Sequence, residues 1–159
     1  MNYVILKVDT TGLDPTSSDI IRISALRVDG EKQVKFSALV NPGHPIPSEA
    51  SEISGVTDED VKDAPSFEEV KESFLVFIDH LPIMGHNIEF DLKFINKYLD
   101  QPLENRCMSL MSLARAANHS GSLKFKALCK SYNITEPDTL LATDLLFHRL
   151  LEDFQKRKR

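Results

Sequence analysis

The chain has little cysteine and no long apolar segment. Its 159 residues include two cysteines, Cys107 and Cys129, which cannot form a disulfide framework and make no Cys-x-x-Cys metal pair. This scarcity is typical of a reducing compartment, so we expect a cytoplasmic protein. No apolar run is long enough to cross a bilayer, and the N-terminus lacks the basic start and cleavage site of a signal peptide. The sequence therefore predicts no membrane partner.

An excess of positive charge is also missing. Lysine and arginine total 19 against 24 aspartates and glutamates, which gives a net charge of -5. This balance argues against a protein that coats long nucleic acid by releasing counterions. It remains compatible with a protein that binds a few nucleotides at the end of a strand. Hydrophobic residues make up 42% and charged residues 27%, which is ordinary for a globular protein, and the length predicts a single domain over 1–159.

Strand and helix signals alternate along the chain. The prolines of "NPGHPIPSEA" predict an extended surface loop over 41–50. Two capping-box spacings, Thr57 with Asp60 and Ser66 with Glu69, predict the starts of two helices. The remaining expected elements are a buried strand at 3–8, a hairpin of 19–28 and 32–40 closed by "DGEK", a short strand within 81–87, and helices at 88–99, 109–117, 122–132 and 139–154.

This order of elements predicts the α/β class, with a mixed β-sheet flanked by helices. In such sheets, chemistry gathers at the carboxyl ends of strands. Asp9 ends the first strand, and "GHNIEFD" follows a later one. We therefore expect the two segments to bring polar groups to one cleft.

Three segments carry a family resemblance: "VDTTGL", "NPGHPIPSEASEISGVTDEDVKDAPSFEEV" and "MGHNIEFDLKFIN". They closely resemble the DEDDh family of 3'-5' exonucleases, which includes the epsilon-subunit-like proofreading domains of bacterial DNA polymerase III. The resemblance runs from Tyr3 to about Leu151 and implies a ribonuclease H-like fold. It also implies hydrolysis of phosphodiesters by two Mg²⁺ or Mn²⁺ ions, which four carboxylates hold, with a histidine as general base.

The catalytic residues of the family carry over only in part. Lys7 stands at the first acid, which in the family bridges both metals, and the second and third acids fall on Asp9 and Asp91. Asp138 best matches the last acid, and Asp144 is the second choice. Neither has the family's histidine five residues before it, where Asn133 and Thr139 stand, and the tyrosine of the sister DEDDy family is missing too. The implied catalytic and metal set is thus Asp9, Asp91 and Asp138.

The implied substrate contacts match better. Four consecutive residues match the turn that faces the terminal nucleotide in relatives, and three more occupy their usual places around the third acid. These substrate-binding candidates are Thr10, Thr11, Gly12, Leu13, His86, Asn87 and Phe90.

Lysine at the bridging position changes the expected function. A charged ammonium has donors and no acceptor, so it cannot bind a metal. We therefore expect a protein that binds the 3' end of single-stranded DNA or RNA with impaired hydrolysis. It would bind Mg²⁺ or Mn²⁺ if it is active, and the alternative is that it binds no metal. Two alternatives stay open: an active metal-dependent exonuclease of replication or repair, and a non-catalytic module that contacts a replication or repair partner.

Each candidate also has a purely structural interpretation. Lys7 and Asp9 can form an ion pair at a strand end. Asp91 and Asp138 can stabilise helix N-termini. His86 and Asn87 can stabilise a loop by hydrogen bonding.

Overall fold

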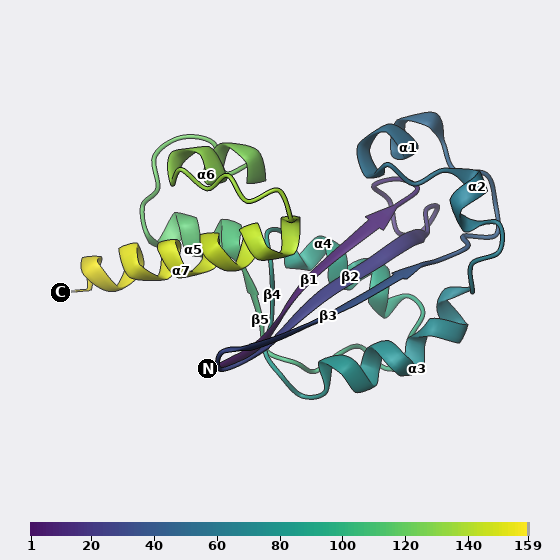
Figure 1. The fold of residues 1–159 in the computed structure, drawn as a ribbon, viewed down its shortest axis with the longest axis horizontal. Helices are drawn as coiled ribbons and strands as arrows, with labels where there is room; N and C mark the ends of the chain where they lie inside the picture. Colours follow the sequence, from purple (N-terminus) through teal and green to yellow (C-terminus); the bar gives the residue numbers. More distant parts are fainter. Residues whose placement is uncertain (159) are drawn as a thin grey trace.

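The computed structural model describes residues 1–158 and is built on one five-stranded sheet in the order β3-β2-β1-β4-β5 (Figure 1). β1 pairs antiparallel with β2, and β2 with β3, whereas β4 is parallel to both β1 and β5. The expected mixed sheet is therefore confirmed. The strands are β1 (Asn2–Thr10), β2 (Ile20–Asp29), β3 (Lys32–Leu39), β4 (Ile83–Gly85) and β5 (Cys107–Ser109).

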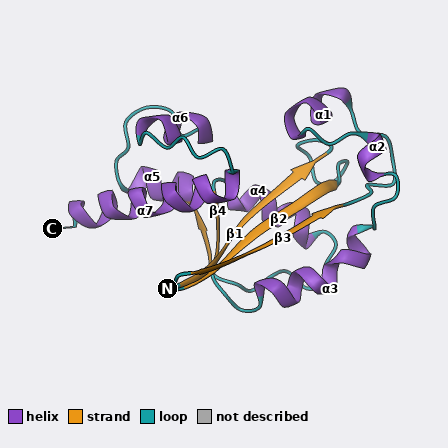
Figure 2. Cartoon of the chain, viewed as in Figure 1, coloured by secondary structure: helices purple, strands orange, loops and turns teal. Residues whose placement is uncertain are grey.

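Helices cover both faces of the sheet (Figure 2). α3 and α4 pack on one face, α5, α6 and α7 pack on the other, and α1 and α2 lie beyond the ends of β1 and β2. None of the helices described is both long and apolar enough to span a membrane. The helices are α1 (Ser48–Ser54), α2 (Asp58–Val61), α3 (Phe67–Ile78), α4 (Ile88–Asn96), α5 (Leu110–Ala116), α6 (Phe125–Ser131) and α7 (Thr139–Arg157).

The alternation of side chains along β1 decides where the polar groups point. Side chains two residues apart on a strand share a face. Tyr3 and Ile5 pack in the core beneath α5, α6 and α7. The side chains of Lys7 and Asp9 point to the same face as those of Tyr3 and Ile5. They therefore lie on the face of the sheet that α7 covers, beyond the apolar core and near the C-terminal end of β1. The opposite row, with Val8 at its end, packs toward α3 and α4.

Several sequence expectations are confirmed in detail. The hairpin of β2 and β3 forms, and both capping boxes are present at the starts of α2 and α3. The largest differences from the expected helix boundaries are that α4 ends at Asn96, α6 begins at Phe125, and α7 continues to Arg157. The expected helices therefore form, and they differ from the expectation only at their ends, where helices fray and boundaries are least defined.

The expectation for residues 41–50 is wrong in part. The segment is irregular only as far as Pro47, because α1 begins at Ser48. Proline is tolerated at a helix start, where its missing N–H has no partner to lose. Ile46 and Ala50 are buried against Ile21 of β2, so this region also carries a small apolar core that covers the end of the sheet.

Candidate active site

Asp9 lies at the end of β1 between two cations. Arg22 is its direct partner across the β1–β2 pair, and its Nε lies 2.9 Å from Asp9 Oδ2. The Lys7 ammonium lies 3.6 Å from the other carboxylate oxygen, Oδ1. Asp9 is only 7% exposed, so these cations compensate for its burial. The predicted pairing of Lys7 with Asp9 is confirmed, and both oxygens of Asp9 already face a positive charge.

Asp91 reaches the same end of β1 from the first turn of α4. Its Oδ1 accepts a hydrogen bond of 3.2 Å from the Val8 N–H. Burial raises the pKa of Asp91 to about 7, although this hydrogen bond and the charge of Lys7 act in the opposite direction. Gly85 of β4 makes room for the carboxylate, since a Cβ there would lie 2.8 Å from the carbonyl oxygen of Leu6 and 3.4 Å from Asp91 Oδ2.

Asp138 is the N-cap residue of α7. Its Oδ1 accepts hydrogen bonds from the N–H groups of Leu140 and Leu141 at 3.0 and 3.1 Å. Its Oδ2 pairs with the Lys35 ammonium of β3, and this contact is the largest cause that lowers the pKa of Asp138. Both oxygens are thus engaged in holding the start of α7 against the sheet.

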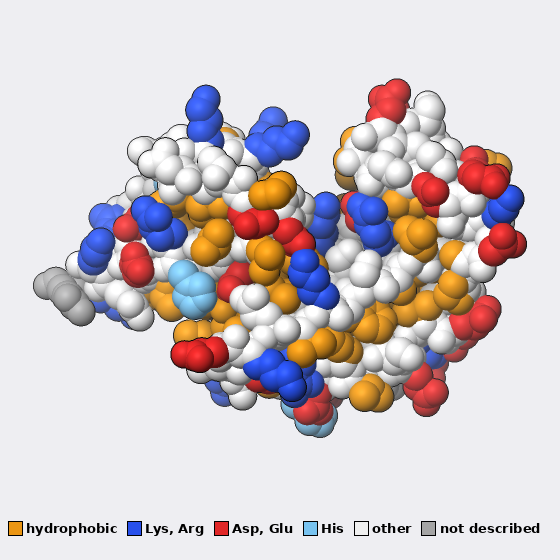
Figure 3. All heavy atoms as spheres, in the orientation of Figure 1, with side chains coloured by type: hydrophobic (Ala, Val, Ile, Leu, Met, Phe, Trp, Pro, Cys, Tyr) orange, Lys and Arg blue, Asp and Glu red, His pale blue; other side chains and the backbone are white. Residues whose placement is uncertain are grey.

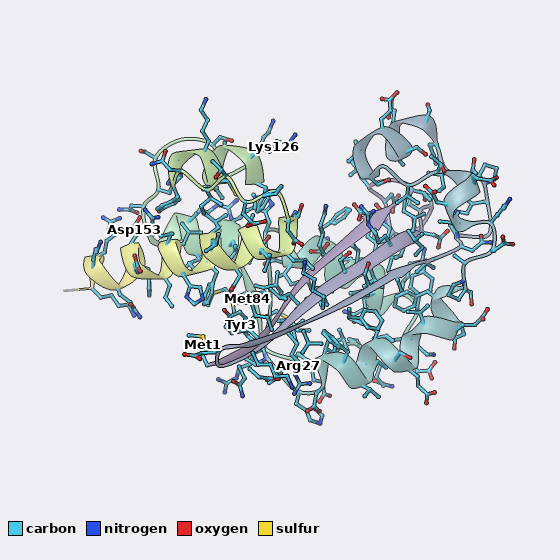
Figure 4. All side chains as sticks on the ribbon, viewed as in Figure 1. Met1, Tyr3, Arg27, Met84, Lys126 and Asp153 are labelled. Atoms are coloured by element: carbon cyan, nitrogen blue, oxygen red, sulfur yellow. The ribbon has the colours of Figure 1, made fainter. Side chains whose placement is uncertain are left out.

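Asp144, the second choice for the last acid, lies elsewhere. It accepts a hydrogen bond from the hydroxyl of Tyr3 and one of 3.4 Å from Gln33 Nε2. Tyr3 lies near the start of β1 (Figure 4), whereas Asp9 lies near the other end of this strand. Between the two alternatives, the structure therefore places Asp138, and not Asp144, near Asp9.

A cleft with two compartments runs beside Lys7. The larger, of about 830 Å³, lies between α6 and α7 on one side and α1 on the other, where the surface is visibly hollowed (Figure 3). The smaller, of about 360 Å³, lies over the sheet. Lys7 lines both compartments. Asp91, His86, Asn87, Phe90, Phe125, Lys126 and Lys130 are among the residues of the larger one, and Asp9, Arg22, Lys35 and Asp138 are among those of the smaller one.

The expected substrate contacts around α4 line the larger compartment. Phe90 is half-buried against Phe94, with ring centroids 5.0 Å apart, and Asn87 is exposed at the helix start. His86 shares a hydrogen bond of 2.7 Å between its Nε2 and the carbonyl oxygen of Leu123. The imidazole therefore also ties the strand end to the loop before α6, as its structural interpretation predicts.

The Thr10–Leu13 turn lies just outside the residues that line the cleft. Thr11 is buried, and its hydroxyl accepts a hydrogen bond of 2.9 Å from the Asp19 N–H. Gly12 packs against Ser18, whose Oγ would lie 2.4 Å from a Cβ at that position. Leu13 is 85% exposed at the tip. The turn is thus held by a hydrogen bond and by close packing, and it exposes one large apolar side chain to solvent.

The donor set does not fit a pair of divalent metals. Within residues 1–158, no three histidine, cysteine or acidic side chains gather closely enough to hold an ion. The implied ligands Asp9, Asp91 and Asp138 are divided between the two compartments. Asp9 is paired with Arg22, and Asp138 is paired with Lys35. These cationic side chains would repel a divalent metal ion that approached the same carboxylates.

Four cationic residues of the cleft were not predicted: Arg22, Lys35, Lys126 and Lys130. Arg22 and Lys35 show a weak signal in the sequence, because each occupies a polar position where polar and apolar residues alternate along its strand. Lys126, labelled in Figure 4, projects from α6 at the rim. No local pattern distinguishes it from an ordinary surface lysine, and only the placement of α6 opposite α1 brings it to the cleft.

Comparison with known proteins decides the family. The family described as "Exonuclease" matches residues 4–156. The chain belongs to the exonuclease family. This domain is 36% identical over 118 residues to DNA polymerase III subunit epsilon of Aquifex aeolicus, a match that covers 71% of the domain and 58% of that subunit. It is 34% identical over 157 residues to a DNA polymerase III subunit epsilon-like protein of Rhodobacter capsulatus, covering 91% of the domain and 22% of that protein.

A solved structure agrees on the fold of this exonuclease-family domain. Exonuclease X in complex with 5' overhanging duplex DNA superimposes with a TM-score of 0.74 at 23% identity, over 98% of the domain and 92% of that chain. This likeness confirms the expected fold, a mixed sheet flanked by helices, and the family match over residues 4–156 confirms the assignment to the exonucleases. The domain spans just over half of the Aquifex subunit and less than a quarter of the Rhodobacter protein.

Proposed function

We propose that this exonuclease-family domain binds the 3' end of single-stranded DNA or RNA and hydrolyses it slowly or not at all. The larger compartment supports binding. It offers the rings of Phe90 and Phe125 together with the ammonium groups of Lys126 and Lys130. Aromatic rings that stack on bases, beside cations that contact the backbone, are the usual means of holding a single strand.

One observation carries the proposed loss of hydrolysis: both carboxylate oxygens of Asp9 face a cationic side chain, Arg22 at 2.9 Å and Lys7 at 3.6 Å. A lysine ammonium has three donors and no lone pair to offer a metal. The position from which relatives bridge two metals is therefore occupied by a positive charge.

The missing general base adds a second, separate loss. Asn133 and Thr139 stand where a histidine would precede the candidate last acids. His86 is the one imidazole that lines the cleft in the described chain, and its Nε2 is engaged by the Leu123 carbonyl. Loss of a general base alone costs roughly 10²–10⁴-fold in rate.

A nuclease assay tests the proposal. Single-stranded DNA and RNA labelled at the 5' end are incubated with the protein and Mg²⁺ or Mn²⁺, beside a family member that has an acid at the position of Lys7. We expect shortening from the 3' end at least about 10²-fold slower than in that relative, because the base alone accounts for this factor. Rapid metal-dependent shortening that Asp91→Ala abolishes would overturn the proposed impairment.

Binding is measured separately from hydrolysis. Fluorescence anisotropy with a labelled strand whose 3' end is free is compared with the same strand whose 3' end is closed in a hairpin. We expect tighter binding of the free end. Equal affinity for both strands would contradict end recognition, and no affinity for either would contradict nucleic-acid binding altogether.

The proposed setting is DNA replication or repair in the cytoplasm. The two relatives named above are a subunit of DNA polymerase III and a protein like it. We propose a protein partner from the same processes for this domain.

A further inference from the structure

The Lys7 ammonium is the least committed cation on the floor of the cleft. Arg22 donates to Asp9 and also to the carbonyl oxygen of Ser54, both at 2.9 Å, and Lys35 is paired with Asp138. Lys7, by contrast, has one ion pair within the described chain, at 3.6 Å. That distance is too long for a good hydrogen bond, so its three N–H donors remain available to a ligand.

Lys7 is also one of two residues in the described chain, with Thr139, that line both compartments. Its side chain is 43% exposed and lines both of them. Across the larger compartment, Lys126 and Lys130 are exposed on α6 and make no ion pair among residues 1–158. A strand lying in this cleft would thus meet one ammonium on the floor and two on a wall, none of them fully neutralised.

We infer that Lys7 binds a backbone phosphate of the strand directly, in the role that a divalent cation would otherwise fill. This inference rests on the proposed function and deepens it, since it names the group that the cleft recognises and makes binding independent of metal. Ammonium groups are common partners of phosphate oxygens, and such contacts set the position of a strand without reading its sequence.

The test is anisotropy of a labelled single-stranded oligonucleotide with excess EDTA and, separately, with Mg²⁺ or Mn²⁺. We expect the wild-type protein to bind equally in both buffers. Lys7→Met should weaken binding about 10-fold. It should also make the slope of log affinity against log salt concentration shallower by about 0.7, which is the value for one phosphate contact to a single strand. Lys7→Arg, which keeps the charge, should restore most of the affinity and the slope.

Lys32→Met is the matched control, because Lys32 is an exposed lysine at the start of β3 that lines neither compartment. It should leave both affinity and salt slope unchanged. A double variant, Lys126→Met with Lys130→Met, should lose about two phosphate contacts. Circular dichroism checks that each variant is folded.

The outcomes separate this inference from the function on which it rests. Binding that requires Mg²⁺ or Mn²⁺ would overturn the role of Lys7 while leaving end binding intact. Metal-independent binding that Lys7→Met does not weaken would also overturn it. Failure of the wild-type protein to bind under any condition would overturn the proposed function and this inference together.

Discussion

At the scale of single residues, the proposed loss of hydrolysis depends chiefly on Lys7, and replacing it with an acid is the most informative change. Lys7→Asp removes a cation beside Asp9 and supplies two oxygen ligands on the same face of β1. We expect measurable Mn²⁺ binding by titration calorimetry, because the new carboxylate stands where relatives bridge their metals.

The same variant should recover little hydrolysis, since no histidine has been restored. Lys7→Asn, which removes the charge without adding a carboxylate, is the control for binding. If Lys7→Asp binds no Mn²⁺, the cationic partners of Asp9 and Asp138 also keep metal from the site, and Lys7 is not the main obstacle to metal binding.

Asp91 gives a pH-dependent prediction. Its pKa is about 7 in the folded protein, above the ordinary value of 3.8, chiefly because it is buried. Between these pH values the folded protein keeps a proton that the unfolded chain has lost. The free energy of unfolding should therefore fall as pH rises from about 4 to about 7, by up to about 1 kcal/mol per pH unit, and then level off.

Asp91→Asn isolates this contribution. The amide oxygen can still accept the hydrogen bond from the Val8 N–H, while the titrating carboxyl is gone. Urea denaturation of both proteins at pH 5 and pH 8 should show a smaller difference in the variant. An unchanged difference would show that Asp91 keeps an ordinary pKa.

The pairing of Lys7 with Asp9 was predictable from sequence, because side chains at positions i and i+2 of a strand point to the same face in any fold. The presence of Arg22 was not. Its contact with Asp9 depends on the register of β1 against β2, in which the two residues are direct partners. Register is a property of the paired strands, and the sequence of either strand alone leaves it open.

At the scale of elements, the start of α7 shows how a candidate catalytic acid can have a structural role. Asp138 caps two N–H groups of the helix and pairs with Lys35. Asp138→Ala should reduce the free energy of unfolding by about 1 kcal/mol, the usual value of an N-cap.

Asp138→Ser is the matched control for that prediction. Serine keeps the cap and loses the carboxylate, so stability should be nearly unchanged apart from the exposed ion pair, which is worth little. Chemical denaturation measures both variants. Equal destabilisation by alanine and serine would show that the pair with Lys35, and not the cap, secures α7.

The two elements that the sequence did not reveal, α1 and β5, are short and depend on tertiary contacts. α1 begins directly after Pro47 and is held by the burial of Ala50 in a small core. β5 is three residues long, and β4 is its only paired neighbour in the described sheet. Such elements have too few residues to show a periodic pattern. The long helix α7 and the hairpin strands, by contrast, show theirs clearly.

At the scale of the whole molecule, a net charge of -5 describes the surface poorly near the cleft. Lys7 and the pair Lys126 and Lys130 come from segments more than a hundred residues apart, and they line one compartment only because α6 and the start of α7 lie beside β1 (Figure 1). The overall charge disfavours coating of long nucleic acid. The local arrangement favours contact with a few phosphates, and only the folded chain shows it.

The order of strands in the sheet also has a consequence for how fast the parts of the site assemble. β1, β2 and β3 pair consecutively, whereas β4 joins β1 only after a loop of more than seventy residues closes. Local pairings form sooner than distant ones. Lys7, Asp9 and Arg22 should therefore come together early in refolding, before Asp91 arrives with α4. Pulse-labelling hydrogen exchange tests this: amides of β2 should gain protection before those of β4, and the reverse order would show that α4 and β4 nucleate the sheet.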